Sequence, residues 1–127
     1  MKKQIAILMG MIVLLAAILI PVMLFSKDPE IGTFQLDEYQ YYIENFPSEE
    51  TLGGIADARD AMNKAEEVLI KTYGKTVRNE KPYQLFYDEQ NEVWLVTGTL
   101  RGNREGGVGN ILMENDTGKV LAVWHDK

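Results

Sequence analysis

The sequence predicts an α+β domain, in which one helix packs on a curved four-stranded antiparallel meander, preceded by a transmembrane helix. Three observations support this. Residues 92–100, EVWLVTGTL, are apolar or β-branched on both faces at the two-residue period of a strand, which is typical of a central strand. Residues 57–73 carry apolar side chains at helical spacing, and residues 5–25 contain no charge. The 127 residues therefore indicate one small domain and an anchor.

The first 25 residues have the composition of a membrane-spanning helix. After Lys2 and Lys3, the 21 uncharged residues 5–25 would reach about 32 Å as a helix, close to the hydrocarbon thickness of a bilayer. A cleaved signal peptide is the alternative, but the run exceeds the roughly 7 to 15 apolar residues of such a signal, and no small-residue cleavage site follows it. Because only Lys27 flanks the other end, the positive-inside rule places residues 1–4 in the cytoplasm. We expect a single-pass protein of the cell membrane with an extracytoplasmic C-terminal domain.

Charge and cysteine content narrow the classes of partner. There is no cysteine, which excludes disulfides, thiolate nucleophiles and Cys-ligated zinc. All 19 Asp and Glu lie beyond residue 25 together with 11 of the 13 Lys and Arg, so this part carries a net charge of −8. An acidic surface disfavours nucleic acid and anionic lipid as partners. It suits a basic protein, although solubility alone explains it equally well.

Residues 26–56 are predicted to form a tether and an aromatic strap. The tether, 26–32, contains proline and glycine. The strap, which we define as residues 33–46, forms either a short amphipathic helix or an irregular segment over the domain. Its aromatic side chains either pack on that domain or offer a platform for a sugar or peptide. They are Phe34, Tyr39, Tyr41, Tyr42 and Phe46.

A helix is predicted after the break at residues 47–54. Asp57 is a suitable N-cap, and Gly74 is a suitable residue just beyond the C-terminus. The apolar stripe contains small alanines that allow close packing on a sheet. The opposite face carries two acid–base pairs at the spacing i, i+4, which indicate a solvated surface and not a pair of catalytic carboxylates: Asp60 with Lys64, and Glu67 with Lys71.

The remaining residues alternate as strands. Residues 115–118, NDTG, are a tight-turn sequence between the last two strands. Gly98 interrupts the central strand and marks a bulge, a bend or a close approach of another part of the chain. The helix covers one apolar face of the sheet, so residues 57–127 form the α+β domain. The predicted strands are 83–87, 92–100, 108–113 and 119–125.

Several motifs occur here in an order and spacing that are recognisable over about 70 residues. They are Tyr73-Gly74-Lys75, Glu80-Lys81-Pro82-Tyr83, the central strand, Gly106-Gly107-Val108, and residues 116–121 with His125 and Lys127. By these motifs, residues 57–127 resemble the bacterial immunity-protein family with a nuclear transport factor 2-like, or cystatin-like, fold. The resemblance implies a domain that binds and neutralises a cognate toxin without chemistry or cofactor. The anchor and residues 26–56 lie outside the family's core pattern and direct the search for a partner to the envelope.

The residue inventory argues against an enzyme. His125 is the only histidine, and Ser26 and Ser48 lie in the tether and the break, so a Ser-His-Asp triad has no held geometry. One histidine and scattered carboxylates provide no metal-ligand spacing. The run 106–109, GGVG, lacks the lysine of a phosphate loop and opens a strand. We therefore predict no catalytic, metal or cofactor site.

Two kinds of binding site are predicted instead. The family resemblance implies a pocket in the cone of the sheet, and its candidate lining residues are Tyr83, Trp94, Trp124 and His125, although the tryptophans are more readily explained as core. Two loops at opposite ends of the meander are candidates for partner contact because loops carry variable recognition. Their residues are Asp88, Glu89 and Glu92 in one loop, and Arg101, Arg104 and Glu105 in the other.

Three hypotheses for the function follow. The first is a membrane-anchored, non-catalytic immunity protein that neutralises a bacterial toxin by occluding it. The alternative is a cell-envelope accessory module or a domain that holds a small ligand. An enzyme on the same fold follows only from the pocket.

Overall fold

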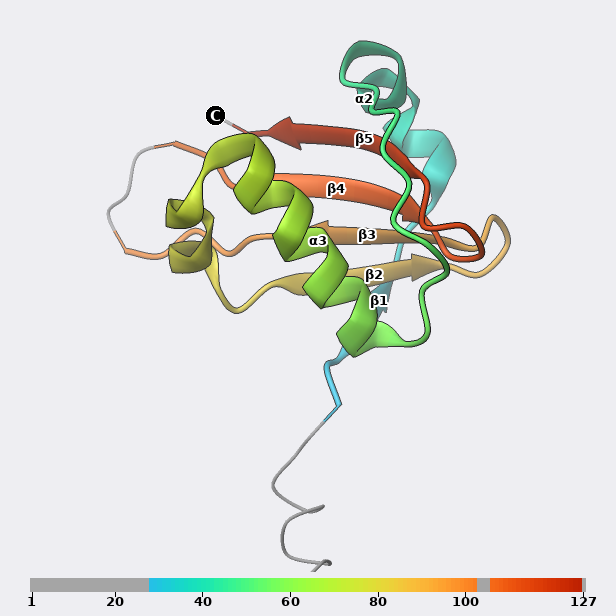
Figure 1. Cartoon of the computed structure of the whole chain (residues 1–127), viewed down its shortest axis with the longest axis horizontal. Coiled ribbons are helices and arrows are strands. Elements are labelled where there is room, and N and C mark those ends of the chain that lie inside the picture. The colour runs from blue at the N-terminus through green and yellow to red at the C-terminus, as the bar shows by residue number, and fades with distance from the viewer. Residues whose placement is uncertain (1–27, 103–105, 127) are drawn as a thin grey trace, which may run out of the picture.

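A five-stranded sheet separates two layers of helix in the computed structural model, which describes residues 28–102 and 106–126 (Figure 1). The strands lie in the order β1-β2-β3-β4-β5. The long helix α3 (Ala58–Tyr73) crosses one face of the sheet. The 3-10 helix η1 (Leu36–Tyr39) and the short helix α2 (Gln40–Asn45) cover the other face.

The predicted transmembrane segment, residues 5–25, lies outside the described residues, as does the cytoplasmic start, residues 1–4. Within the described ranges, no helix has both the length and the apolar character needed to cross a membrane. The anchor therefore stays a prediction.

Helix α3 begins and ends where the sequence predicts. The Asp57 carboxylate accepts a hydrogen bond of 2.8 Å from the backbone N–H of Asp60, which satisfies one of the free donors of the first turn. At the other end Gly74 adopts a φ of 94°, and its N–H donates to the carbonyl of Ile70 at 2.7 Å. Glycine takes this conformation without the strain that a Cβ would cause. The 3-10 helix η2 (Lys75–Glu80) follows directly.

The two faces of α3 differ as the periodicity predicts. On the outer face Lys64 pairs with Asp60 at 2.6 Å, as expected. Lys71, predicted to pair with Glu67, instead reaches Glu50 at 3.0 Å, because residues after the strap pass beside the helix. The inner face is buried against the sheet and consists of Ala61, Ala65, Val68 and Leu69.

The antiparallel meander is confirmed. Its strands pair in sequence order, and β3 is the middle strand of the sheet. Trp94, Leu95 and Val96 are each at most 6 % exposed, so both faces of this strand are covered, as its two apolar faces predict. The strands are β2 (Gln84–Asp88), β3 (Val93–Thr97), β4 (Gly109–Glu114) and β5 (Val120–His125).

Gly98 lies where the central strand approaches another segment closely. A Cβ at this position would be 2.5 Å from Oε1 of Glu80 and 3.2 Å from Cβ of Val108. The same Glu80 oxygen accepts a 2.7 Å hydrogen bond from the backbone N–H of Gly109, so the carboxylate is held in place. Of the three possibilities that Gly98 left open, close approach is thus present.

A fifth strand corrects the predicted four-stranded sheet. Strand β1 (Ile31–Thr33) pairs in parallel with β2, with Ile31 opposite Leu85. Gly32 allows this pairing, since a Cβ there would lie 2.6 Å from the ring of Phe86. Strand β1 spans the boundary between the predicted tether and the strap, and its three residues are too few to show an alternating pattern.

The strap forms the second helical layer. Of the two forms left open, the helical one is present, and the inward aromatic side chains pack on the sheet. Tyr42 stacks on Trp124 with ring centroids 4.2 Å apart and an interplanar angle of 16°. At the end of the strap, the carbonyl of Phe46 accepts a backbone hydrogen bond from Val123, and after the strap the carbonyl of Glu50 accepts one from Val120, so the outer edge of β5 is covered.

Candidate functional site

The four residues of the predicted pocket do not converge on one cleft. Tyr83 and Trp94 belong to the core between the sheet and α3, whereas Trp124 belongs to the core beneath the strap. His125 is exposed at the end of β5, with its ring 5.4 Å from that of Tyr73. Because adjacent strand residues point to opposite faces, Trp124 and His125 cannot line the same pocket.

Both tryptophans use their indole N–H within the fold. Trp94 Nε1 donates to Oδ1 of Asn115 at 2.9 Å, and Trp124 Nε1 donates to Oδ1 of Asp126 at 3.2 Å. Both side chains are almost completely buried. Each tryptophan is therefore part of a core, the alternative that the sequence left open.

The two predicted partner loops lie at opposite ends of the meander (Figure 1). In the first, Glu89 and Glu92 are exposed, but Asp88 is only 6 % exposed. Asp88 accepts hydrogen bonds from the backbone N–H of Leu36 at 2.8 Å and from the backbone and side chain of Asn91. Asp88 thus joins the strap to the sheet and does not face a partner.

The second predicted loop is only partly described. Arg101 is exposed next to the end of the central strand. Arg104 and Glu105 lie outside the described residues, so their proposed role stays a prediction.

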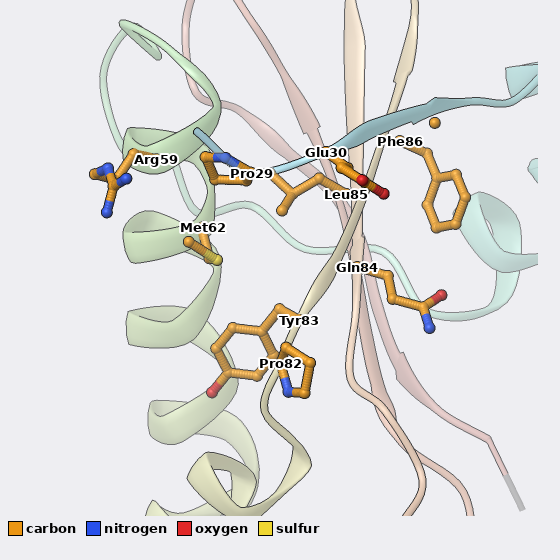
Figure 2. Close-up of a pocket in the computed structure, with 10 residues that line it drawn as sticks. Pro29, Glu30, Arg59, Met62, Pro82, Tyr83, Gln84, Leu85 and Phe86 are labelled. Carbon is orange, nitrogen blue, oxygen red and sulfur yellow. The ribbon is translucent and has the colours of Figure 1, made fainter. Parts of the chain in front are cut away.

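A groove lined by described residues lies between α3 and the start of β2 (Figure 2). Its volume is about 610 Å³, and Met62, Pro82, Tyr83 and Leu85 provide an apolar wall. We call it the helix-side groove. A second hollow of about 440 Å³ continues it along α3, shares three of these residues, and adds charged side chains at its rim. The charged residues lining the two hollows are Glu30, Arg59, Glu66, Lys81 and Arg101.

A buried hydroxyl and an ion pair lie along this groove. The hydroxyl of Tyr83, a residue 6 % exposed, lies beside the Glu66 carboxylate without a hydrogen bond of standard geometry. Burial first, and then the Glu66 carboxylate, raise the pKa of Tyr83. Burial acts to raise the pKa of Glu66 as well, but Lys81 at 3.0 Å, the Tyr83 hydroxyl and Arg78 at 3.7 Å together lower it below its usual range. Glu66 is therefore held ionised and Tyr83 protonated, an arrangement suited to binding.

Of the residues along this groove and the hollow that continues it, sequence reasoning named only Tyr83, as a pocket residue, and Arg101, as a loop residue. Residues of α3 and of the segment before β1 meet β2 there only after folding, so their separation along the chain conceals the groove. Glu66 and Lys81 are separated along the sequence by more than one helix turn, so no local spacing pattern predicts their ion pair. Among residues 28–102 and 106–126, no group of three His, Asp or Glu is placed to hold a metal ion.

Comparison with known proteins identifies the family to which the chain belongs. A family model described as an NTF2 fold immunity protein matches residues 60–127, just over half of the chain. No curated protein and no solved structure matches the chain significantly. The matched region contains nearly all of α3 and the whole meander, which agrees with the NTF2-like α+β arrangement of a helix on a sheet. The chain belongs to the family of NTF2 fold immunity proteins.

Proposed function

We propose that this protein binds a cognate bacterial toxin and neutralises it by occlusion, without catalysing a reaction. Membership of the immunity-protein family carries this proposal, since the family suggests a toxin-neutralising binding role. The ion-paired Glu66 and the protonated Tyr83 support a binding surface better than acid–base chemistry, because neither is free to exchange a proton near neutral pH.

We propose further that residues 5–25 anchor the protein in the cell membrane, with residues 1–4 in the cytoplasm and the folded domain outside. The uncharged run and the lysines that precede it support this topology. The partner would then be a toxin, or another protein, that is present in the cell envelope.

The direct test is protection of cells from a defined toxin. A toxin domain that co-purifies with the full-length chain from its native host is expressed in a sensitive host, with and without the full-length chain. We expect growth only when the chain is present, and a stable complex with an inactivated toxin domain at a Kd on the order of 10 nM or below. The absence of both protection and complex formation would refute the proposal.

A second candidate function is a module that holds a small ligand in the envelope, and the helix-side groove favours it. Here an unpartnered, buried Tyr83 hydroxyl borders a largely apolar hollow. A thermal-shift screen of small amphipathic compounds should then give a stabilising hit that is lost in Tyr83→Phe, which removes only the hydroxyl. A screen without such a hit would leave the groove as a packing feature.

A further inference from the structure

The charged side chains of the strap are all acidic. The strap contains Asp37, Glu38 and Glu44 and no Lys or Arg. Every Lys and Arg of the described ranges lies outside this segment, on α3, in η2 or in loops. Three of these cations line the helix-side groove and the hollow that continues it: Arg59 in the groove, and Lys81 and Arg101 in the hollow. The strap therefore presents negative charges alone, whereas α3 carries charges of both signs, and we call the strap side of the sheet the acidic face.

Two adjoining grooves open on this acidic face. The first, about 400 Å³ in volume, lies between η1 and strands β2 to β4, and we call it the strap-side groove. Its apolar lining includes Phe34, Phe86 and Leu95, and its acids are Glu38 and Asp126. The second, about 460 Å³, shares Phe34 and Glu38 and adds Glu89. None of the described residues that line the two grooves is Lys, Arg or His.

Two side chains of the strap-side groove, Asn110 and Asp126, have oxygens that can accept further hydrogen bonds. Asn110 is 4 % exposed, and its Nδ2 donates to the carbonyl of Val108 at 2.9 Å. No described residue donates a hydrogen bond to the side-chain oxygen of Asn110. One carboxylate oxygen of Asp126 accepts the hydrogen bond from the Trp124 indole, and no described residue donates to the other oxygen. Neither oxygen is a buried atom without a partner, so both can accept a hydrogen bond from solvent or from a ligand in the groove.

The negative potential reaches into the strap layer itself. Burial first, and then the charges of Glu38 and Asp126, raise the pKa of Tyr39, which lines the same groove. Both carboxylates therefore act on one point of the groove, although they come from opposite ends of the described chain. A cation placed there would meet two acids and no competing positive side chain.

The strap layer also carries an exposed aromatic pair, Tyr41 and Phe46. Tyr41 is 63 % exposed and Phe46 42 % exposed, with ring centroids 6.4 Å apart. Tyr42 packs against both rings and stacks on the buried Trp124, so the pair rests on the core. Rigid exposed aromatic side chains are enriched among the residues that dominate binding at protein interfaces.

We propose that the strap layer is the face that docks the cognate toxin, and that the strap-side groove receives an arginine side chain of this basic partner. This inference rests on the proposed function. Arginine fits because its planar guanidinium carries five donors and no acceptor, and stacks on aromatic rings. Its apolar stem would lie on Phe86 and Leu95 while the guanidinium donates to Glu38, Asp126 and Asn110.

The groove is tested with a defined probe, N-acetyl-arginine amide, added to the ¹⁵N-labelled full-length chain in mild detergent. We expect saturable NMR shifts of the Trp124 indole N–H and the Asn110 side-chain amide, with a Kd on the order of millimolar. N-acetyl-norleucine amide, which keeps the stem and lacks the guanidinium, should leave both signals in place. Equal shifts with both probes, or none with arginine, would overturn the assignment.

Matched variants test whether the arginine probe binds in the strap-side groove. Glu38→Gln should weaken binding of the arginine probe by about five-fold, because it removes one carboxylate from the exposed rim without changing its shape. The control Glu67→Gln changes an equally exposed acid on α3 and should leave the Kd unchanged. Equal weakening by both substitutions would mean a general charge effect and would contradict a site in this groove.

The docking face is tested with the inactivated toxin domain. Glu38→Lys and Tyr41→Ala should each raise its Kd by about ten-fold or more, whereas Glu67→Lys should not. If the toxin domain binds the wild type and both strap variants equally well, the docking inference fails and the proposed function stands. If it does not bind the wild type, the proposed function fails, and the probe titration still decides the groove. Micromolar binding of the arginine probe with a toxin affinity independent of Glu38 would instead identify a free guanidinium ligand.

Discussion

The Asp88 carboxylate joins two segments that are distant in sequence. It accepts the backbone N–H of Leu36, the first residue of η1, and the backbone and side-chain donors of Asn91 in the turn after β2. The preceding residue Gln35 provides no side-chain cap to η1, so Asp88 fulfils that role from the sheet. A residue that the sequence places in an exposed acidic loop is in fact a structural connection.

The pH dependence of stability should reveal this connection. The bonds from Asn91 and then from Leu36 lower the pKa of Asp88 below its ordinary value of 3.8. A carboxyl with a lowered folded pKa stabilises the fold fully above its unfolded pKa, and this contribution disappears as the pH falls through the folded value. We therefore expect Asp88→Asn to have a lower Tm than the wild type at pH 7, and the difference to shrink below about pH 3.8. A difference in Tm that stays constant down to about pH 2 would contradict this explanation.

At the scale of elements, the strap is a layer whose two tyrosines at adjacent positions have opposite roles. Tyr42 points inward and stacks on Trp124, whereas Tyr41 points outward and is 63 % exposed. Helix α2 is only six residues long, too short to be stable alone, so its position depends on such inward contacts.

These neighbouring tyrosines provide a matched pair of substitutions. We expect Tyr42→Ala to lower the free energy of unfolding by about 2 kcal/mol, because it removes a half-buried ring from a packed stack. Tyr41→Ala should cost about 0.5 kcal/mol or less, as is usual at the surface. Chemical denaturation of the two variants measures both values. Equal losses would mean that the strap is not held to the sheet by its inward face.

At the scale of the whole molecule, the predictable parts are those with a local pattern. The bounds of α3 follow from a cap, a period of 3.6 and a glycine, and the meander follows from alternation and turn residues. Strand β1 has three residues and pairs with a strand more than fifty positions away, so no local sequence pattern predicts it. The sequence already indicates that the four predicted pocket residues cannot all line one pocket, since Trp124 and His125 are adjacent in a strand and must point to opposite faces. The grooves depend on which layers meet, which a single sequence does not contain.

The orientation of the two faces follows from where the chain enters the fold. Residues 29 and 30 border the helix-side groove, and α2 lies at the opposite end of the molecule from this point (Figure 1). If residues 5–25 hold the chain in a membrane, the helix-side groove lies nearer the membrane and the aromatic pair of α2 points away from it. The strap layer would then be the face that a partner in the envelope meets first.

Protease accessibility of the folded domain in intact cells tests this arrangement. Trypsin is added to cells, after removal of an outer wall or membrane where one is present, and the full-length mass is read by blot before and after treatment. We expect the untreated chain to retain residues 5–25, and trypsin added from outside to cut at Lys27, in the tether between anchor and domain, while a cytoplasmic control protein stays intact. A shorter untreated mass would instead indicate a cleaved signal peptide. Protection of the domain until the membrane is opened would reverse the topology, because the two lysines before the apolar run outnumber the one after it by a single charge, and a cytoplasmic toxin would become the partner to test.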